Sequence, residues 1–150
     1  MSSGIQVTLL RDTARLPTQG TTEAAGANTY CDADFTIPPW SRHCVPTGIA
    51  AQPPPGHYLQ LYSRSSMAWH HGILVAGGVI DRDYTGEIKV ILCNHSDEAY
   101  HARAGDRIAQ MVCHKIAAPV IKDVTSNIVK FGRGDTSSNR DCRSFGSTGR

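Results

Sequence analysis

Short apolar runs separated by glycine- and proline-rich turns dominate this sequence and leave little room for helices. The alternating segments Ile5–Leu10 and His57–Tyr62 favour β-strands, because successive side chains of a strand point to opposite faces. Pro53–Gly56, which precedes the second of them, is incompatible with a helix or a central strand. Only Ser65–His71 has a helical pattern, and it is short. The sequence therefore predicts an all-β sandwich, barrel or jelly roll with one short helix.

Other short apolar runs complete the predicted strands: Phe35–Pro39, Cys44–Ile49, Ile73–Val75, Val79–Ile80, Ile88–Cys93, Tyr100–Ala102, Ile108–Ile116 and Val120–Ile121. The unbroken apolar run Ile88–Cys93 is typical of a strand that is covered on both faces. Pro17–Ala27 is polar and rich in small residues, so we expect a loop there. Trp40 and Trp69 are expected to be packing residues.

The 150 residues suffice for one domain and its core. We expect a β domain over residues 1–124. Residues 125–150 are rich in Gly, Ser, Asp, Asn and Arg, and this composition predicts a mobile C-terminal arm with little to bury. The net charge of +2 lies mostly in that arm and is too small for a nucleic-acid surface.

Neither a membrane span nor a signal peptide is indicated by the apolar runs. The chain has five cysteines, an odd number, and they are scattered along the sequence without the spacing of metal ligands. We interpret them as reduced thiols, which places the protein in an intracellular, reducing compartment.

The segment Gly77–Gly86 joins a turn, a strand and two chemically useful side chains. Its paired glycines allow the backbone to approach a ligand closely. Asp81 follows an apolar strand, where a carboxylate can hold an attacking water as general base. Tyr84 can stack on a flat ligand. A plain β-hairpin with surface acids is the alternative, and this segment alone does not separate the two.

Three other segments suit a small polyanion, although each also has a plain structural interpretation. Arg64 precedes two serines at the expected helix start, where anions and N-caps are both favoured. Gln110 is an amide inside an apolar strand, which needs either core partners or a polar ligand. Phe145–Arg150 could wrap hydroxyl and N–H groups around phosphates, or could be a disordered tail.

Taken together, five segments resemble the five motifs of the trimeric dUTP pyrophosphatases (dUTPases), in order and at compatible spacing. They are Ala24–Gly26 with Phe35–Pro39, Arg64–Ala68, Gly78–Gly86, Gly105–Gln110, and Arg140 with Phe145–Gly149. The third segment is the most specific of the five. The resemblance covers nearly the whole chain from about residue 5.

This resemblance implies a jelly-roll homotrimer that hydrolyses dUTP to dUMP and pyrophosphate with Mg²⁺ bound by the three phosphates. Such an enzyme limits uracil incorporation into DNA and supplies dUMP for dTMP synthesis. By position, Asp81 would be the catalytic base, and Tyr84 would pack under the deoxyribose. The tail would close over a neighbouring subunit's site. The substrate-binding residues implied are Arg64, Ser65, Ser66, Gly77, Gly78, Val79, Ile80, Tyr84, Gln110, Arg140, Phe145, Gly146, Ser147 and Thr148.

Two departures from the family pattern motivate an alternative function. Asn28 stands where the family usually has an aspartate that holds a magnesium-bound water, so an indirect metal contact there would lack the negative charge. Asp32 and Asp34 lie nearby but do not align with it. Side chains at residues 141–144 replace the usual glycines of the tail. The alternative is a dUTPase-derived nucleotide-binding or regulatory protein with weak or no catalysis.

A third possibility, the related dCTP deaminases, requires a glutamate base where this chain has Ile91, and isoleucine cannot move a proton. Divergent virus-encoded copies are common among dUTPases. The sequence therefore leaves open a cellular or a viral source, and either the cytoplasm or the nucleus of the cell or host.

Overall fold

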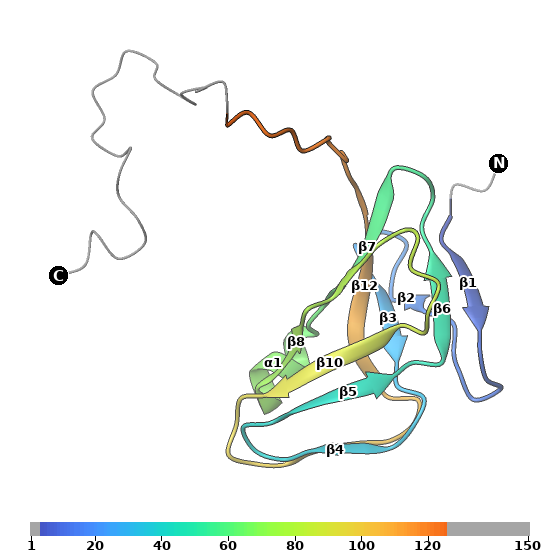
Figure 1. The fold of residues 1–150 in the computed structure, drawn as a ribbon. Coiled ribbons are helices and arrows are strands. Elements are labelled where there is room, and N and C mark those ends of the chain that lie inside the picture. The colour runs from blue at the N-terminus through green and yellow to red at the C-terminus, as the bar shows by residue number, and fades with distance from the viewer. Residues whose placement is uncertain (1–3, 126–150) are drawn as a thin grey trace. The chain divides into compact units, whose positions relative to one another are not determined.

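The computed structural model describes residues 4–125. The chain divides into two units, of which the first ends at Ala118 and the second begins at Pro119. Among the described residues, every strand and the helix belong to the first unit (Figure 1). The elements are β1 (Gln6–Leu9), β2 (Thr18–Gln19), β3 (Ala27–Tyr30), β4 (Phe35–Ile37), β5 (Arg42–Pro46), β6 (Ile49–Gln52), β7 (His57–Tyr62), α1 (Ser65–His71), β8 (Ile73–Ala76), β9 (Val79–Ile80), β10 (Lys89–Asn94), β11 (Tyr100–Ala102) and β12 (Arg107–Lys115).

The strands form antiparallel sheets that enclose one apolar core. The largest has the order β2-β3-β12-β7-β9, and a three-stranded sheet has the order β5-β10-β8. Two strand pairs, β1-β6 and β11-β4, complete the described part of the chain. This mostly-β architecture with one short helix confirms the predicted fold class.

Alternation along β7 shows how the sequence places the core. Leu59 and Leu61 are buried, while the residues between and beside them are at least partly accessible. Leu59 lies opposite Ile80 of β9, so the short strand that follows Gly77 and Gly78 is fixed to the central sheet. Burial of such side chains is the main favourable term for this packing.

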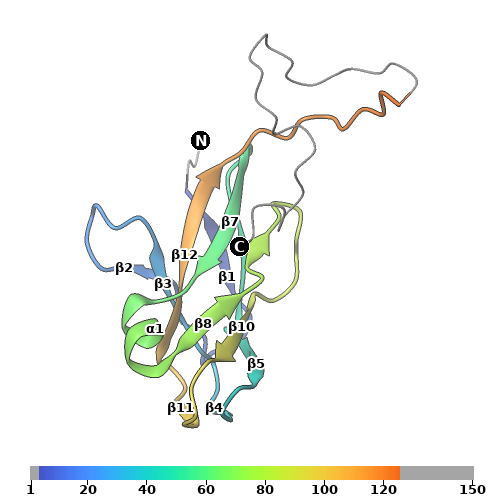
Figure 2. The ribbon, with the colours of Figure 1, turned by 90° about the vertical axis from the view of Figure 1, so that its left-hand side faces the viewer.

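Helix α1 begins directly after β7 and runs beside β8 (Figure 2). Met67 is its buried residue and anchors the helix in the core. Gly72 ends the helix in the left-handed conformation, with φ of 65°, which glycine adopts without steric cost. Arg64 occupies the N-cap position but makes no capping hydrogen bond with its side chain. The plain alternative for this segment, an ordinary serine N-cap, is therefore not what the structure has, and the anion-binding interpretation stays a prediction.

Several other local predictions also need correction. Ile88–Cys93 is not covered on both faces, because β10 alternates between buried and accessible residues. The expected loop Pro17–Ala27 contains β2 and the first residue of β3, which pair through Gln19 and Ala27. No strand forms at Val120–Ile121.

The two tryptophans do not pack in the core. Trp40 is 70% exposed and Trp69 is 85% exposed. Trp40 also has a positive φ of 55°, which is uncommon for a residue with a bulky side chain. Within residues 4–125, no helix is both long and apolar enough to cross a membrane.

Candidate active site

A cavity of about 280 Å³ lies beside β9 and the loop that follows it. It contains five of the residues that the sequence singled out, on one continuous segment of the chain. Apolar side chains from β7, from β10 and from Ile88 just before β10 form much of its wall. Its lining residues are Cys44, Leu61, Gly78, Val79, Ile80, Asp81, Tyr84, Ile88, Lys89 and Ile91.

Gly77 and Gly78 shape the entry to β9. Both have positive φ, 64° and 100°, which favours glycine. A side chain at Gly78 would place its Cβ 2.8 Å from the carbonyl oxygen of Leu61. That carbonyl belongs to β7, whose Leu61 N–H also donates to the Gly78 carbonyl at 2.9 Å. The glycine therefore lets two backbones approach closely at the wall of the cavity.

Asp81 and Tyr84 lie on the loop between β9 and β10. The Tyr84 N–H donates to the carbonyl oxygen of Asp81 at 3.1 Å, which closes a tight turn. The Tyr84 hydroxyl donates to the carbonyl oxygen of Glu87 at 2.8 Å. Both side chains are exposed at the rim of the cavity, where a carboxylate and a flat ring can meet a bound molecule.

The anion-binding candidates form a second cluster, where β7 meets the helix. Arg64 donates from Nη1 to the carbonyl oxygen of Arg107 at 3.1 Å, and Gln110 donates from Nε2 to the carbonyl oxygen of Ser63 at 3.2 Å. Ser65 and Ser66 are exposed at the first turn of α1. This part of the fold thus brings together a guanidinium, an amide and two hydroxyls, which are side-chain groups that can bind phosphate oxygens.

Asn28 belongs to this second cluster. It pairs with Gln110 across β3 and β12, and Gln110 in turn pairs with Tyr62 of β7. Directly paired residues of antiparallel strands project to the same face, so these polar side chains form a row on the sheet. Asp34 makes a different contact, because its Oδ1 accepts the Ala104 N–H at 2.8 Å.

Within residues 4–125, the cavity and the second cluster share no lining residue. The cavity is lined by residues Gly78–Asp81 and Tyr84, but not by Arg64, Ser65, Ser66 or Gln110. Gly77 flanks the cavity without lining it. The predicted tail residues Arg140, Phe145, Gly146, Ser147 and Thr148 lie outside the described residues, as does Cys142.

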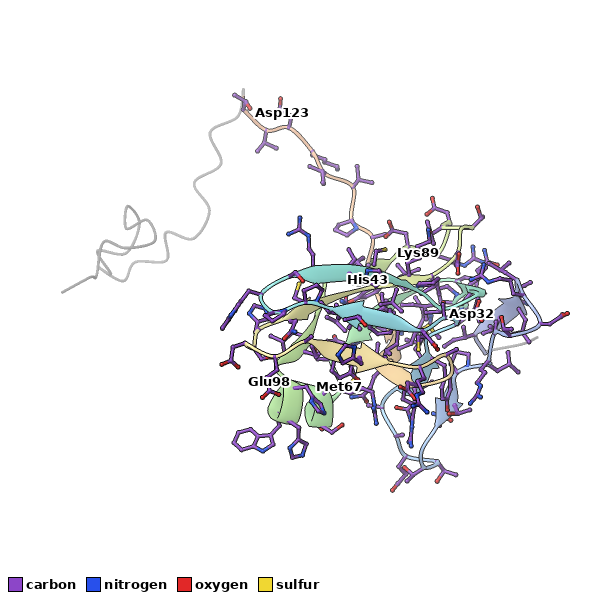
Figure 3. All side chains as sticks on the ribbon, turned by 90° about the horizontal axis from the view of Figure 1, so that it is seen from below. Asp32, His43, Met67, Lys89, Glu98 and Asp123 are labelled. Atoms are coloured by element: carbon purple, nitrogen blue, oxygen red, sulfur yellow. The ribbon has the colours of Figure 1, made fainter. Side chains whose placement is uncertain are left out.

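Sequence reasoning missed the contributions of β5 and β10 to this cavity. Cys44 lies opposite Ile91 in the pairing of these strands, and Lys89 lies two residues before Ile91. Both Cys44 and Lys89 also line an adjacent cavity of about 520 Å³, together with Asp32. The Asp32 and Lys89 side chains are labelled in Figure 3. The burial of β10 alternates along the strand, so Lys89 and Ile91 are on its accessible face. The sequence Ile88–Cys93 is nearly all apolar and therefore does not reveal this alternation.

It also missed a charged network next to the loop. Arg11 forms ion pairs with Asp32 and Glu87, which are far from it in sequence. Hydrogen bonds from Thr13 and then from Arg11 hold the pKa of Asp32 below its ordinary value. The hydrogen bond from Arg11, followed by that from the Gly48 N–H, lowers the pKa of Glu87. Asp32 is therefore part of this network through its Oδ2 atom.

The donor set suits a magnesium ion that arrives with the substrate rather than a protein-built metal site. Among residues 4–125, no group of three or more His, Cys, Asp or Glu side chains could hold a metal ion. Mg²⁺ keeps several waters and commonly binds through one or two protein groups together with substrate phosphates. The amide oxygen of Asn28 is a neutral group of this kind, next to Gln110.

Comparisons with known proteins identify the family. A family model described as dUTPase matches residues 12–140. The deoxyuridine 5'-triphosphate nucleotidohydrolase of Candida glabrata is 38% identical, over 97% of this chain and 96% of that protein. The corresponding protein of Saccharomyces cerevisiae is 37% identical, over 97% of this chain and 94% of that protein.

A solved structure agrees with these sequence relatives. The structure is of a mutant dUTPase from phage phi11 of Staphylococcus aureus, described as showing the coordination of a structural Mg(II) ion. It superposes with a TM-score of 0.74 at 25% identity, over 80% of this chain and 95% of that one. Since the family model matches most of its length and the sequence relatives cover nearly all of it, this chain belongs to the dUTPase family.

Proposed function

We propose that the protein hydrolyses dUTP to dUMP and pyrophosphate, by attack of water on the α-phosphorus. The observation that carries this is the cavity beside β9, where Asp81 and Tyr84 meet the backbone of Gly78–Ile80 in a chain of the dUTPase family. This activity limits uracil incorporation into DNA and supplies dUMP for dTMP synthesis.

In this proposal the hairpin around Gly77–Ile80 recognises the base. Backbone groups held by the central sheet hydrogen-bond the uracil edge, and the tight hairpin leaves no space for the methyl group of thymine. Tyr84 packs under the deoxyribose, where a 2′-hydroxyl would collide with the ring. The close approach of β7 at Gly78 supports such selectivity, because a rigid wall discriminates by shape.

Asp81 acts as the general base. Its carboxylate stands at the rim of the cavity, exposed to water, and follows a buried strand residue that fixes its backbone. It orients a water molecule and accepts its proton as the water attacks the α-phosphorus. Phosphoryl chemistry of this kind depends mainly on positioning and charge neutralisation.

The triphosphate is held by the second cluster, namely Arg64, Ser65, Ser66 and Gln110. Asn28 would hold Mg²⁺ indirectly, through a water molecule, and the ion would supply charge neutralisation for the three phosphates. Arg140 clamps the γ-phosphate, while Phe145 covers the base and Gly146, Ser147 and Thr148 wrap the phosphates.

A homotrimer would unite the two clusters. Within one chain the cavity lacks Arg64, Ser65, Ser66 and Gln110, so a neighbouring subunit must supply them if all act on one nucleotide. This arrangement makes each site an interface between subunits.

Cys31, Cys44, Cys93 and Cys113 are all free thiols, which supports a reducing intracellular compartment.

The decisive assay measures pyrophosphate release from dUTP in the presence of Mg²⁺, with UTP, dTTP and dCTP as comparison substrates. We expect turnover of dUTP in large preference to the other three. Tight dUTP binding without turnover would instead favour a nucleotide-binding or regulatory protein. In that case Asn28→Asp tests the cause, because restored turnover would assign the defect to the missing negative charge.

A further inference from the structure

Arg11 joins two acidic residues that come from distant parts of the chain. Its Nε pairs with Asp32, and its Nη2 pairs with Glu87. The Asp32 side chain is only 4% exposed and that of Glu87 is 17% exposed, whereas Arg11 is 44% exposed. A guanidinium carries several N–H donors in a rigid planar fork, so two of its nitrogens can hold two carboxylates in a fixed geometry, whereas a lysine ammonium offers no such fixed arrangement.

Glu87 is also tied to the backbone of β6 and its preceding turn. Its Oε1 accepts the Gly48 N–H at 2.9 Å. The next residue, Ile88, donates its N–H to the carbonyl oxygen of Ile49 at 2.8 Å. Residues 87 and 88 are therefore fixed through the side chain of one and the backbone of the other.

The same residue supports the catalytic loop. The Glu87 carbonyl oxygen accepts the Tyr84 hydroxyl, and the Tyr84 N–H closes the turn onto Asp81. A rotation of the peptide at Glu87 would move the acceptor of the tyrosine hydroxyl. The position of the ring in the loop thus depends on the place where Arg11 holds Glu87.

We propose that Arg11, acting with Asp32 and Glu87, is a positioning residue that sets the placement of Tyr84 and so the discrimination between deoxyribose and ribose nucleotides. The inference rests on the proposed function for its substrate. Arg11 does not line the cavity of the site, so it acts through Glu87 and the loop and not by touching the nucleotide.

A merely structural role is the competing explanation, and a ratio of rates separates the two. Loss of a stabilising pair would reduce the amount of folded enzyme and lower the rates for dUTP and UTP equally. A displaced Tyr84 ring changes the ratio of the two kcat/KM values, which does not depend on the concentration of active enzyme.

The experiment compares wild type with Arg11→Gln, Glu87→Gln and Arg11→Lys. We expect the preference for dUTP over UTP to fall by about tenfold in the first two variants, through a higher KM for dUTP and better use of UTP. Arg11→Lys retains the charge but lacks the rigid planar fork, so its preference should lie between those values. Arg42→Gln, which removes an exposed arginine on β5, is the matched control and should retain the wild-type preference.

Deuterium uptake of the backbone provides a readout that needs no turnover. Arg11→Gln should increase uptake in the peptide over residues 81–88 and leave β7 and β12 unchanged. Wild-type protein that hydrolyses neither nucleotide would refute the proposed function, and the uptake would still decide the role of Arg11. An unchanged dUTP preference, or unchanged uptake over residues 81–88 in Arg11→Gln, would overturn the positioning role.

Discussion

Gly78 places the backbone before β9 where any larger residue would collide with β7. Its φ of 100° and the 2.8 Å approach of a hypothetical Cβ to the Leu61 carbonyl oxygen are two separate requirements for glycine. Asp81, three residues further on, is the proposed general base. Substitution of Gly78 therefore tests the shape of the cavity wall, and substitution of Asp81 tests the reaction.

The shape of the wall is tested by Gly78→Ala. The substitution combines backbone strain with a steric clash, so we expect a loss of about 1–3 kcal/mol in the free energy of unfolding and weaker binding of a dUTP analogue. Gly56→Ala is the matched control, since Gly56 also has a positive φ of 75° but has nothing within 4 Å of its Cβ position. Equal losses in urea denaturation of the two variants would show that the clash with β7 contributes nothing.

The reaction is tested by Asp81→Asn. Asparagine keeps the size of the side chain but cannot accept the proton of the attacking water, so kcat for dUTP should fall by about 10²–10⁴-fold. The variant's far-ultraviolet circular dichroism spectrum and the mass of its native oligomer should match those of wild type, because the Asp81 side chain is exposed. Wild-type turnover by this variant would remove Asp81 from the mechanism.

The loop between β9 and β10 is the element on which the site depends. One end continues a strand that pairs with β7, and the other end is held by the ion pairs of Glu87 with Arg11. Both Glu87 and Asp32 have pKa values below their ordinary values of 4.5 and 3.8. The folded protein therefore binds protons at these groups more weakly than the unfolded chain does, and acid favours unfolding.

This linkage predicts a dependence of stability on pH that Arg11→Gln should weaken. The stabilisation from the two carboxylates is fully present above their ordinary pKa values and is lost as the pH falls through the lowered ones. The difference in unfolding free energy between wild type and Arg11→Gln should thus be largest near neutral pH and shrink toward about pH 3. Urea denaturation at a series of pH values measures it, and a difference that grows in acid would contradict the assignment.

The elements that the sequence predicted well are those with a clear apolar period. His57–Tyr62 and Ser65–His71 have the predicted bounds, because alternation and a helical stripe mark them. The short β2 and the strand Ala27–Tyr30 lack such a period, and pairing with β12 makes the latter a strand. Local β-propensity does not predict strand pairing between segments that are far apart in the sequence.

The candidate site divides in the same way. Asp81 and Tyr84 are close in sequence to the strand that positions them, so their place at one cavity could be predicted. Arg11, Asp32 and Glu87 look like ordinary surface charges, and only the fold brings them together. Long-range ion pairs of this type leave no signal in composition or spacing.

At the scale of the whole molecule, the proposed homotrimer would build each site from the two clusters of neighbouring subunits. The cavity residues and the anion-binding residues do not meet in the described part of one chain. A closed trimer of identical chains would repeat each shared interface three times. In this arrangement dUTP hydrolysis requires the assembled trimer, so a change in oligomeric state should change the activity.

Mixed trimers test this link directly. Asp81→Asn and Arg64→Ala should each be nearly inactive alone, since each removes one half of every site. After joint unfolding and refolding in equal amounts, about a quarter of the wild-type activity should return, because random assembly pairs two intact halves at that frequency. If each site were built within one chain, mixing would restore no activity, and native mass spectrometry would show whether mixed trimers had formed.

Hydrolysis of dUTP in ¹⁸O-labelled water tests the central chemistry most directly. Attack of an Asp81-bound water on the α-phosphorus predicts one labelled oxygen in dUMP and none in pyrophosphate, with the labelled product lost in Asp81→Asn. Label found in pyrophosphate, or label incorporated at the wild-type rate by the variant, would contradict the proposed mechanism.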